Sequence, residues 1–104
     1  MIKEGYLAKI KTYPEFCLVV TRTAHSDLAP SDALLFDWKD KKIDWKEYER
    51  RFREEITSNP KAMCLLRSIK ELYGGYNRDL RLICYEKEAP CHRFILLKMI
   101  EELG

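Results

Sequence analysis

The chain has 104 residues, which is the size of one small domain, and we expect a single α/β domain over residues 1–104. Apolar residues make up 46% and charged residues 35%, so a small core is surrounded by a heavily charged surface. The 19 basic and 17 acidic residues are spread evenly along the chain, which excludes a basic tail for non-specific nucleic-acid binding. No apolar run approaches the roughly 18 residues of a membrane span, so no membrane partner is expected.

Two further features of composition bear on the setting of the protein. The first five residues, Met1 to Gly5, lack the apolar segment of a secretory signal, so a cytoplasmic location is expected. Gln is absent and Asn occurs only at positions 59 and 77, while Lys, Glu and Arg are plentiful. This pattern is typical of proteins from hot environments, where ion-pair networks contribute more to stability.

Two strands are predicted in the first part of the chain. Weak alternation over Gly5–Ile10 predicts a short strand, and Tyr13-Pro14 ends it because proline cannot donate to a sheet. The run Phe16–Thr21 is continuously apolar or β-branched, which indicates a strand that is covered on both faces in a parallel sheet. A polar loop follows, as far as Pro30.

Three helices are predicted next, each with a recognisable start. Ser31 is expected to cap a helix that reaches about Lys41. Asp44 begins a second, whose apolar face comprises Trp45, Tyr48, Phe52 and Ile56, and whose other faces hold Glu–Arg pairs four residues apart. Asn59 followed by Pro60 starts a third, and Gly74-Gly75 predicts a left-handed stop after Tyr73.

The C-terminal part returns to a strand and ends in a helix. Leu80–Tyr85 is apolar and predicts a central strand parallel to Phe16–Thr21, and Cys91–Leu103 predicts a well-buried helix. Helices between strands require crossover connections. We therefore predict the α/β class, with a small, mainly parallel sheet of three or four strands packed with about four helices.

The chain has four cysteines, and none of them forms a CxxC pair. Cys17 and Cys64 lie in apolar patterns and are interpreted as small buried hydrophobic residues. Cys84 and Cys91 are expected to be reduced, because the expected compartment is reducing and because a strand end and a helix start usually hold two Cα atoms more than about 7 Å apart. A zinc site at Cys84, Cys91 and His92 is not favoured, since it offers only three ligands, two of them adjacent. No metal and no cofactor is therefore expected.

The candidate site lies where the predicted strands end. Ligands of open parallel sheets bind beyond the carboxyl ends of the strands, and a helix N-terminus at Cys91 would present free N–H groups there. Arg93, Lys87 and Arg22 would add positive charge and make the edge a cradle for an anion. We expect Arg93 to face the cleft beside the loop Thr21–Ser26.

The same helix start carries groups suited to catalysis. A thiol at a helix N-terminus beside Arg and His has a lowered pKa, so Cys91 is the candidate nucleophile and should be the most reactive of the thiols. His92 can exchange a proton near neutral pH, and Glu86 can act as a base or orient Arg93.

The C-terminal motif resembles a known family. Leu82 to Lys87, followed by Cys91-His92-Arg93, is similar to the signature of the domain-of-unknown-function 488 family, in which an apolar strand ends in Cys-x-Glu and Cys-His-Arg opens the next helix. Val19–Arg22 resembles its first core strand, and the remainder is similar to a compact prokaryotic or archaeal branch of the family. The resemblance implies an α/β fold with a site around Cys-His-Arg and adds Cys84 to the ligand-binding candidates. Larger members carry Asp-Val-Arg where this chain has Val20-Thr21-Arg22, so their acidic partner is missing here.

Three functions remain open from the sequence. The favoured one is a module that binds an anionic small molecule, a phosphate or a nucleotide-like ligand through Arg22, Arg93 and the helix N-terminus. The alternative is a thiol-dependent enzyme or redox sensor that uses Cys91. A small structural or interaction protein is the third, and the oligomeric state is not predicted.

Overall fold

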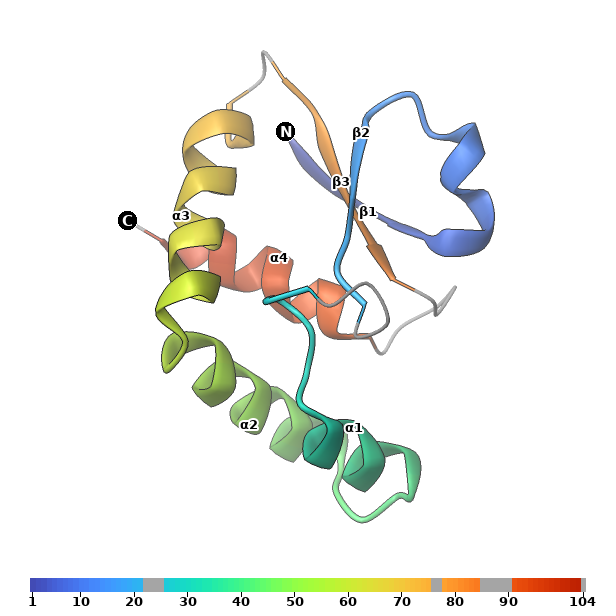
Figure 1. The fold of residues 1–104 in the computed structure, drawn as a ribbon, viewed down its shortest axis with the longest axis vertical. Coiled ribbons are helices and arrows are strands. Elements are labelled where there is room, and N and C mark those ends of the chain that lie inside the picture. Colours follow the sequence, from blue (N-terminus) through green and yellow to red (C-terminus); the bar gives the residue numbers. More distant parts are fainter. Residues whose placement is uncertain (22–25, 76–77, 85–90, 104) are drawn as a thin grey trace.

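Strand β3 (Leu80–Cys84) lies between β1 (Ile2–Tyr6) and β2 (Phe16–Val19) in the sheet. The computed structural model describes residues 1–21, 26–75, 78–84 and 91–103. Within these residues the sheet has three strands in the order β1-β3-β2, and both pairings are parallel (Figure 1). The α/β class, the parallel sheet and the central position of the strand that begins at Leu80 are confirmed.

The first strand lies earlier in the chain than predicted. It spans Ile2–Tyr6, and Leu7–Thr12 forms a 3₁₀ helix, η1. The apolar residues Leu7 and Ile10 are three apart, which places them on the same side of a 3₁₀ helix but on opposite faces of a strand. Gly5 is buried in β1, and a Cβ atom at this position would lie 2.7 Å from the Tyr13 ring, so the packing of the ring favours glycine here.

The prediction that the second strand is covered on both faces is wrong. Strand β2 lies at an edge of the sheet, Phe16 is 65% exposed, and the other three residues of the strand are half-buried. The covered strand is β3, in which every residue except Arg81 is buried. A continuous apolar run therefore occurs here in an edge strand as well as in the central one.

Four helices follow the predicted order: α1 (Asp32–Lys39), α2 (Trp45–Thr57), α3 (Pro60–Tyr73) and α4 (His92–Glu102). The side chains of Ser31, Asp44 and Asn59 accept hydrogen bonds from backbone N–H groups in the first turns of α1, α2 and α3, so these three caps are confirmed. The predicted left-handed stop at Gly74 is wrong, because Gly74 has a φ of −69° and continues the helical conformation. Among the described residues the non-glycine with positive φ is Lys41, after α1.

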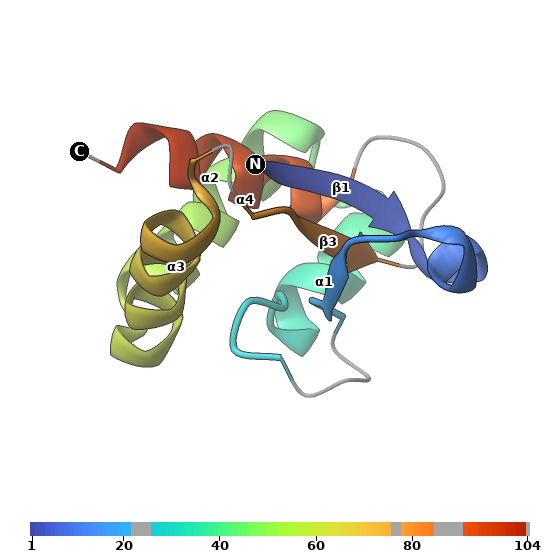
Figure 2. The ribbon, with the colours of Figure 1, turned by 90° about the horizontal axis from the view of Figure 1, so that it is seen from above.

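The helices form one layer and the sheet the other. Helix α4 contacts β1 and β3, and α2 and α3 also pack on α4 (Figure 2). Side chains alternate along a strand, so Leu80, Leu82 and Cys84 of β3 share one face, and the two leucines belong to the core with α4. The carboxyl end of β3 and the start of α4 therefore meet inside the molecule.

Ion pairs lie on the surface of α2. The predicted pairs Glu49–Arg53 and Arg50–Glu54 are present, whereas Arg51 pairs with Asp37 of α1 instead of a residue on its own helix.

Of the helices in the described part of the chain, the longest has 14 residues, and none is both long and apolar enough to cross a bilayer.

Candidate functional site

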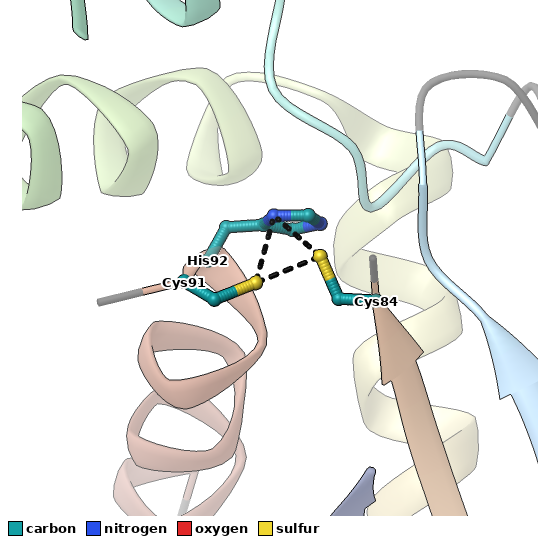
Figure 3. A group of neighbouring side chains, drawn as sticks. All are labelled: Cys84, Cys91 and His92. Carbon is teal, nitrogen blue, oxygen red and sulfur yellow. Dashed lines mark hydrogen bonds between the residues drawn. The ribbon is translucent and has the colours of Figure 1, made fainter. Parts of the chain in front are cut away.

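Three reactive side chains meet at the carboxyl end of β3. Cys84 is the last residue of β3, Cys91 is the N-cap of α4, and His92 is the first residue of that helix. The sulfur atoms of Cys84 and Cys91 are 2.7 Å apart, and the His92 ring lies beside both (Figure 3). All three residues are buried, with exposed fractions of 2%, 4% and 7%. The predicted location at the sheet edge therefore contains a compact, shielded cluster.

The orientation of the His92 ring is fixed from two sides. Its Nε2 atom lies 2.7 Å from the backbone carbonyl oxygen of Val20, and its ring packs edge-to-face on Phe52 at 5.5 Å between centroids. A carbonyl oxygen only accepts hydrogen bonds, so Nε2 carries the hydrogen and Nδ1 carries the lone pair. Nδ1 lies 3.6 Å from the Cys84 sulfur and 3.7 Å from the Cys91 sulfur. A basic nitrogen therefore faces both thiols.

The two thiols are not equivalent. The hydrogen bond with Cys91 raises the pKa of Cys84 far above its usual range, burial raises it further, and His92 opposes both effects. Cys84 therefore stays a neutral thiol.

Arg93 is held inside the fold by a carboxylate. Its side chain is fully buried, and its Nε atom donates to a carboxylate oxygen of Glu4, on β1, at 2.8 Å. Burial works to lower the pKa of Arg93, but the hydrogen bond to Glu4 and the charge interaction with the Cys91 side chain raise it on balance. The guanidinium therefore remains charged close to the sulfur atoms.

The model of the family DUF488-N3a, described as the active DUF488-N3 subclade, matches residues 20–104. The chain belongs to the DUF488-N3a family. The resemblance drawn from Cys-x-Glu and Cys-His-Arg is thereby confirmed. Among curated proteins and among solved structures, no significant match to the chain was found.

The structure brings together some of the residues predicted for the site. Of the seven, Cys84, Cys91 and His92 form the cluster, and Arg93 borders it. Arg22, Glu86 and Lys87 lie outside the described residues, as does most of the loop that was expected to form a cleft with Arg93.

Three further residues of this DUF488-N3a protein support the site and were missed from the sequence. Glu4 neutralises Arg93, Phe52 packs on His92, and Val20 fixes the histidine tautomer. Glu4 lies in a strand of mixed composition, Ile-Lys-Glu-Gly-Tyr, so the sequence pattern did not single it out. No side-chain signal exists for Val20, because only its backbone takes part.

The other cysteines differ from prediction. Cys64 is exposed and Cys17 is half-buried, so the interpretation of both as buried core residues is wrong. Cys64 lies in α3 but not among the buried residues Ala62, Leu66 and Ile69. The structure holds all four cysteines as free thiols, yet the sulfur atoms of Cys84 and Cys91 lie only 2.7 Å apart. That Cys84 and Cys91 are reduced in solution stays a prediction.

Proposed function

We propose that this DUF488-N3a protein is a thiol-dependent redox protein in which Cys84 and Cys91 interconvert between two thiols and a disulfide. The observation that carries the proposal is the 2.7 Å contact between their sulfur atoms, with His92 Nδ1 beside both. Only small side-chain movements separate this arrangement from the roughly 2.05 Å of a disulfide bond. The description of the family as an active subclade supports a working site over a purely structural motif.

The reaction is a thiol–disulfide exchange with a disulfide-containing substrate. The Cys91 sulfur, deprotonated by Nδ1 of His92, attacks one substrate sulfur, forms a mixed disulfide and displaces one thiolate, which takes up the proton. Cys84 then attacks the Cys91 sulfur, the Cys84–Cys91 bond forms, and the second substrate thiol leaves with the Cys84 proton. Two electrons pass from the protein to the substrate, so the pair is oxidised and the substrate disulfide is reduced.

Binding of an anionic small molecule or nucleotide ranks second to this redox function. The guanidinium of Arg93 is fully buried and its charge is already balanced by Glu4, so an anion bound there would have to be desolvated beside a neutralised pair. We assign Arg93 instead to holding a positive charge beside the thiols. The proposal also places the protein in the cytoplasm, where a reduced thiol pair is the resting state.

The test measures formation of the Cys84–Cys91 disulfide. The whole protein is equilibrated with oxidised and reduced glutathione in the presence of EDTA, quenched with acid, alkylated and mapped by mass spectrometry. We expect a stoichiometric Cys84–Cys91 disulfide under oxidising ratios. The Cys84→Ser variant should instead accumulate glutathione on Cys91, because the second step is blocked.

The Cys64→Ser variant is the matched control, since it removes an exposed thiol that is not part of the cluster. It should form the Cys84–Cys91 disulfide as the unmodified chain does. If Cys84 and Cys91 both remain thiols while Cys64 becomes glutathionylated, the redox proposal is wrong and the cluster is structural.

A further inference from the structure

We infer that Cys84, Cys91 and His92, with both thiols in the reduced state, form a binding site for Zn²⁺ that leaves one coordination position open. This inference goes beyond the proposed redox function and does not depend on it, because it requires only the reduced side chains. It revises the sequence-based expectation that no metal site is present.

The spacing of the three ligand atoms suits zinc. They lie within 4.8 Å of one another. Zinc bonds of about 2.3 Å to sulfur and about 2.05 Å to nitrogen, at tetrahedral angles, place nitrogen and sulfur ligands about 3.6 Å apart. The distances from His92 Nδ1 to the sulfur atoms of Cys84 and Cys91 are 3.6 and 3.7 Å.

The sulfur–sulfur distance must widen when the ion enters. Two thiolates on a tetrahedral zinc ion lie about 3.8 Å apart, and the present separation is 2.7 Å. The hydrogen bond that holds the sulfur atoms together is lost when both protons leave. Rotation of the cysteine side chains can supply this movement without a change in the backbone.

Adjacent residues can both bind because of the helix start. Cys91 is the N-cap of α4 and has the extended backbone angles φ −149° and ψ 149°, while His92 is already helical. Successive side chains in this bend do not diverge as they would along a strand, and Figure 3 shows both directed at the Cys84 sulfur. The objection that two ligands are neighbours in sequence is therefore removed by the local conformation.

The surroundings also favour a metal ion. Zinc-binding histidines commonly donate their second ring N–H to a carboxylate or a backbone carbonyl, and His92 Nε2 does so to Val20. Two thiolates balance the charge of Zn²⁺, so the filled site is neutral, and the neighbouring Arg93–Glu4 pair is neutral as well. Three protein ligands with an open position are typical of zinc sites that bind water or a substrate.

The test uses Co²⁺ as a coloured substitute for Zn²⁺. The whole protein is reduced with a phosphine, freed of metal and titrated with Co²⁺. We expect thiolate-to-cobalt charge-transfer absorption and the intense visible bands of tetrahedral cobalt, saturating at one ion per chain and lost when Zn²⁺ is added. Zinc affinity, measured by competition with a chromophoric chelator, should fall by more than about 100-fold in Cys84→Ser, Cys91→Ser and His92→Gln, beyond the loss typical of an outer partner.

The Cys64→Ser variant is the control and should bind both metals as the unmodified chain does. Absence of the tetrahedral cobalt spectrum in the unmodified chain overturns the inference, whether or not the variants fold. Zinc binding that survives in the variants, or that is lost in Cys64→Ser, also overturns it. Zinc binding without a disulfide in the glutathione experiment supports the inference and refutes the redox proposal. A Cys84–Cys91 disulfide in that experiment without zinc binding supports the redox proposal and refutes the inference.

Discussion

Glu4 is the partner of a fully buried cation, and this makes an edge-strand residue part of the candidate site. Its carboxylate accepts from Arg93 at 2.8 Å, although the Glu4 side chain is 39% exposed. Removing a carboxylate that balances a buried charge leaves more of the desolvation cost of that charge uncompensated. The energetic role of Glu4 is therefore larger than its exposure suggests.

Glu4→Gln should lower the free energy of unfolding by about 2 kcal/mol, because it removes the charge of the carboxylate that faces buried Arg93. Urea unfolding followed by circular dichroism measures this change. Glu54→Gln is the matched control, since Glu54 pairs with Arg50 on the exposed surface of α2 and should cost less than about 1 kcal/mol. Equal effects of the two substitutions would contradict the structural role of the Glu4–Arg93 pair.

The accessibility of the cysteines changes the order of reactivity expected from sequence. Cys64 is exposed, whereas Cys91 is 4% and Cys84 2% exposed. Iodoacetamide should therefore label Cys64 of the native protein first. Of the buried pair, Cys91 should react before Cys84, because the pKa of Cys84 is raised.

Peptide mapping over a time course measures the order in which the cysteines are labelled. The urea-unfolded protein is the control, since unfolding removes the differences in burial. Labelling of Cys84 ahead of Cys91 would contradict the assignment of Cys91 as the attacking thiol.

At the scale of elements, the segment between β1 and β2 is attached to the sheet by an ion-pair cluster. Glu15 accepts from Arg81 of β3 at 2.8 Å and from Lys3 of β1 at 3.3 Å, and the Arg81 guanidinium also lies over the Tyr13 ring. The hydrogen bond from Arg81 lowers the pKa of Glu15 from its usual 4.5 to about 2. One carboxylate thus connects the central strand, an edge strand and the segment that follows η1.

Because the pKa of Glu15 is lower in the folded protein than in the unfolded chain, its contribution to stability is complete above about pH 4.5 and is lost as the pH falls toward about 2. The stability difference between the unmodified chain and Glu15→Gln should therefore be constant near neutral pH and shrink through this acidic range. Urea unfolding at a series of pH values measures it. A difference that stays constant down to pH 2 would show that the Glu15 charge is not stabilising.

Short-range signals predicted the elements well where one residue decides a boundary. Ser31, Asp44 and Asn59 cap helices because their side chains reach N–H groups only two or three residues away. Gly74 shows the opposite case, since glycine permits a left-handed stop without requiring one. The start of β1 was missed because its hydrogen-bonding partner, β3, lies near the other end of the chain.

The candidate site was predictable only in its location. Topology places Cys84 and the start of α4 at the same edge of the sheet, and this could be reasoned from the apolar pattern. The contact between Cys84 and Cys91 depends on side-chain torsions, and the pairing of Arg93 with Glu4 depends on which strand lies beside β3. A periodic pattern in the sequence carries neither kind of information.

For the whole molecule, the order β1-β3-β2 gives β3 hydrogen-bonding partners on both sides. Backbone amides of the central strand open only when the sheet itself opens, whereas amides of an edge strand have one side free. Hydrogen–deuterium exchange should therefore be slowest in Leu80–Cys84 and faster in Ile2–Tyr6 and Phe16–Val19. Mass spectrometry of peptic fragments measures the rates. Exchange in β3 as fast as in β1 would contradict the order of the strands.

The central strand is also the last strand in the chain, and this has a consequence for how the protein is made. During synthesis, β1 and β2 leave the ribosome long before β3 exists to pair with them, while the neighbouring helices α2 and α3 can already pack on each other. Pairings between distant parts of a chain form slowly, because a large loop must close before any contact is gained. Cys84, Cys91 and His92 all arrive with this final segment. A nascent chain therefore carries no assembled thiol cluster, and the chemistry of the site begins only when the sheet closes.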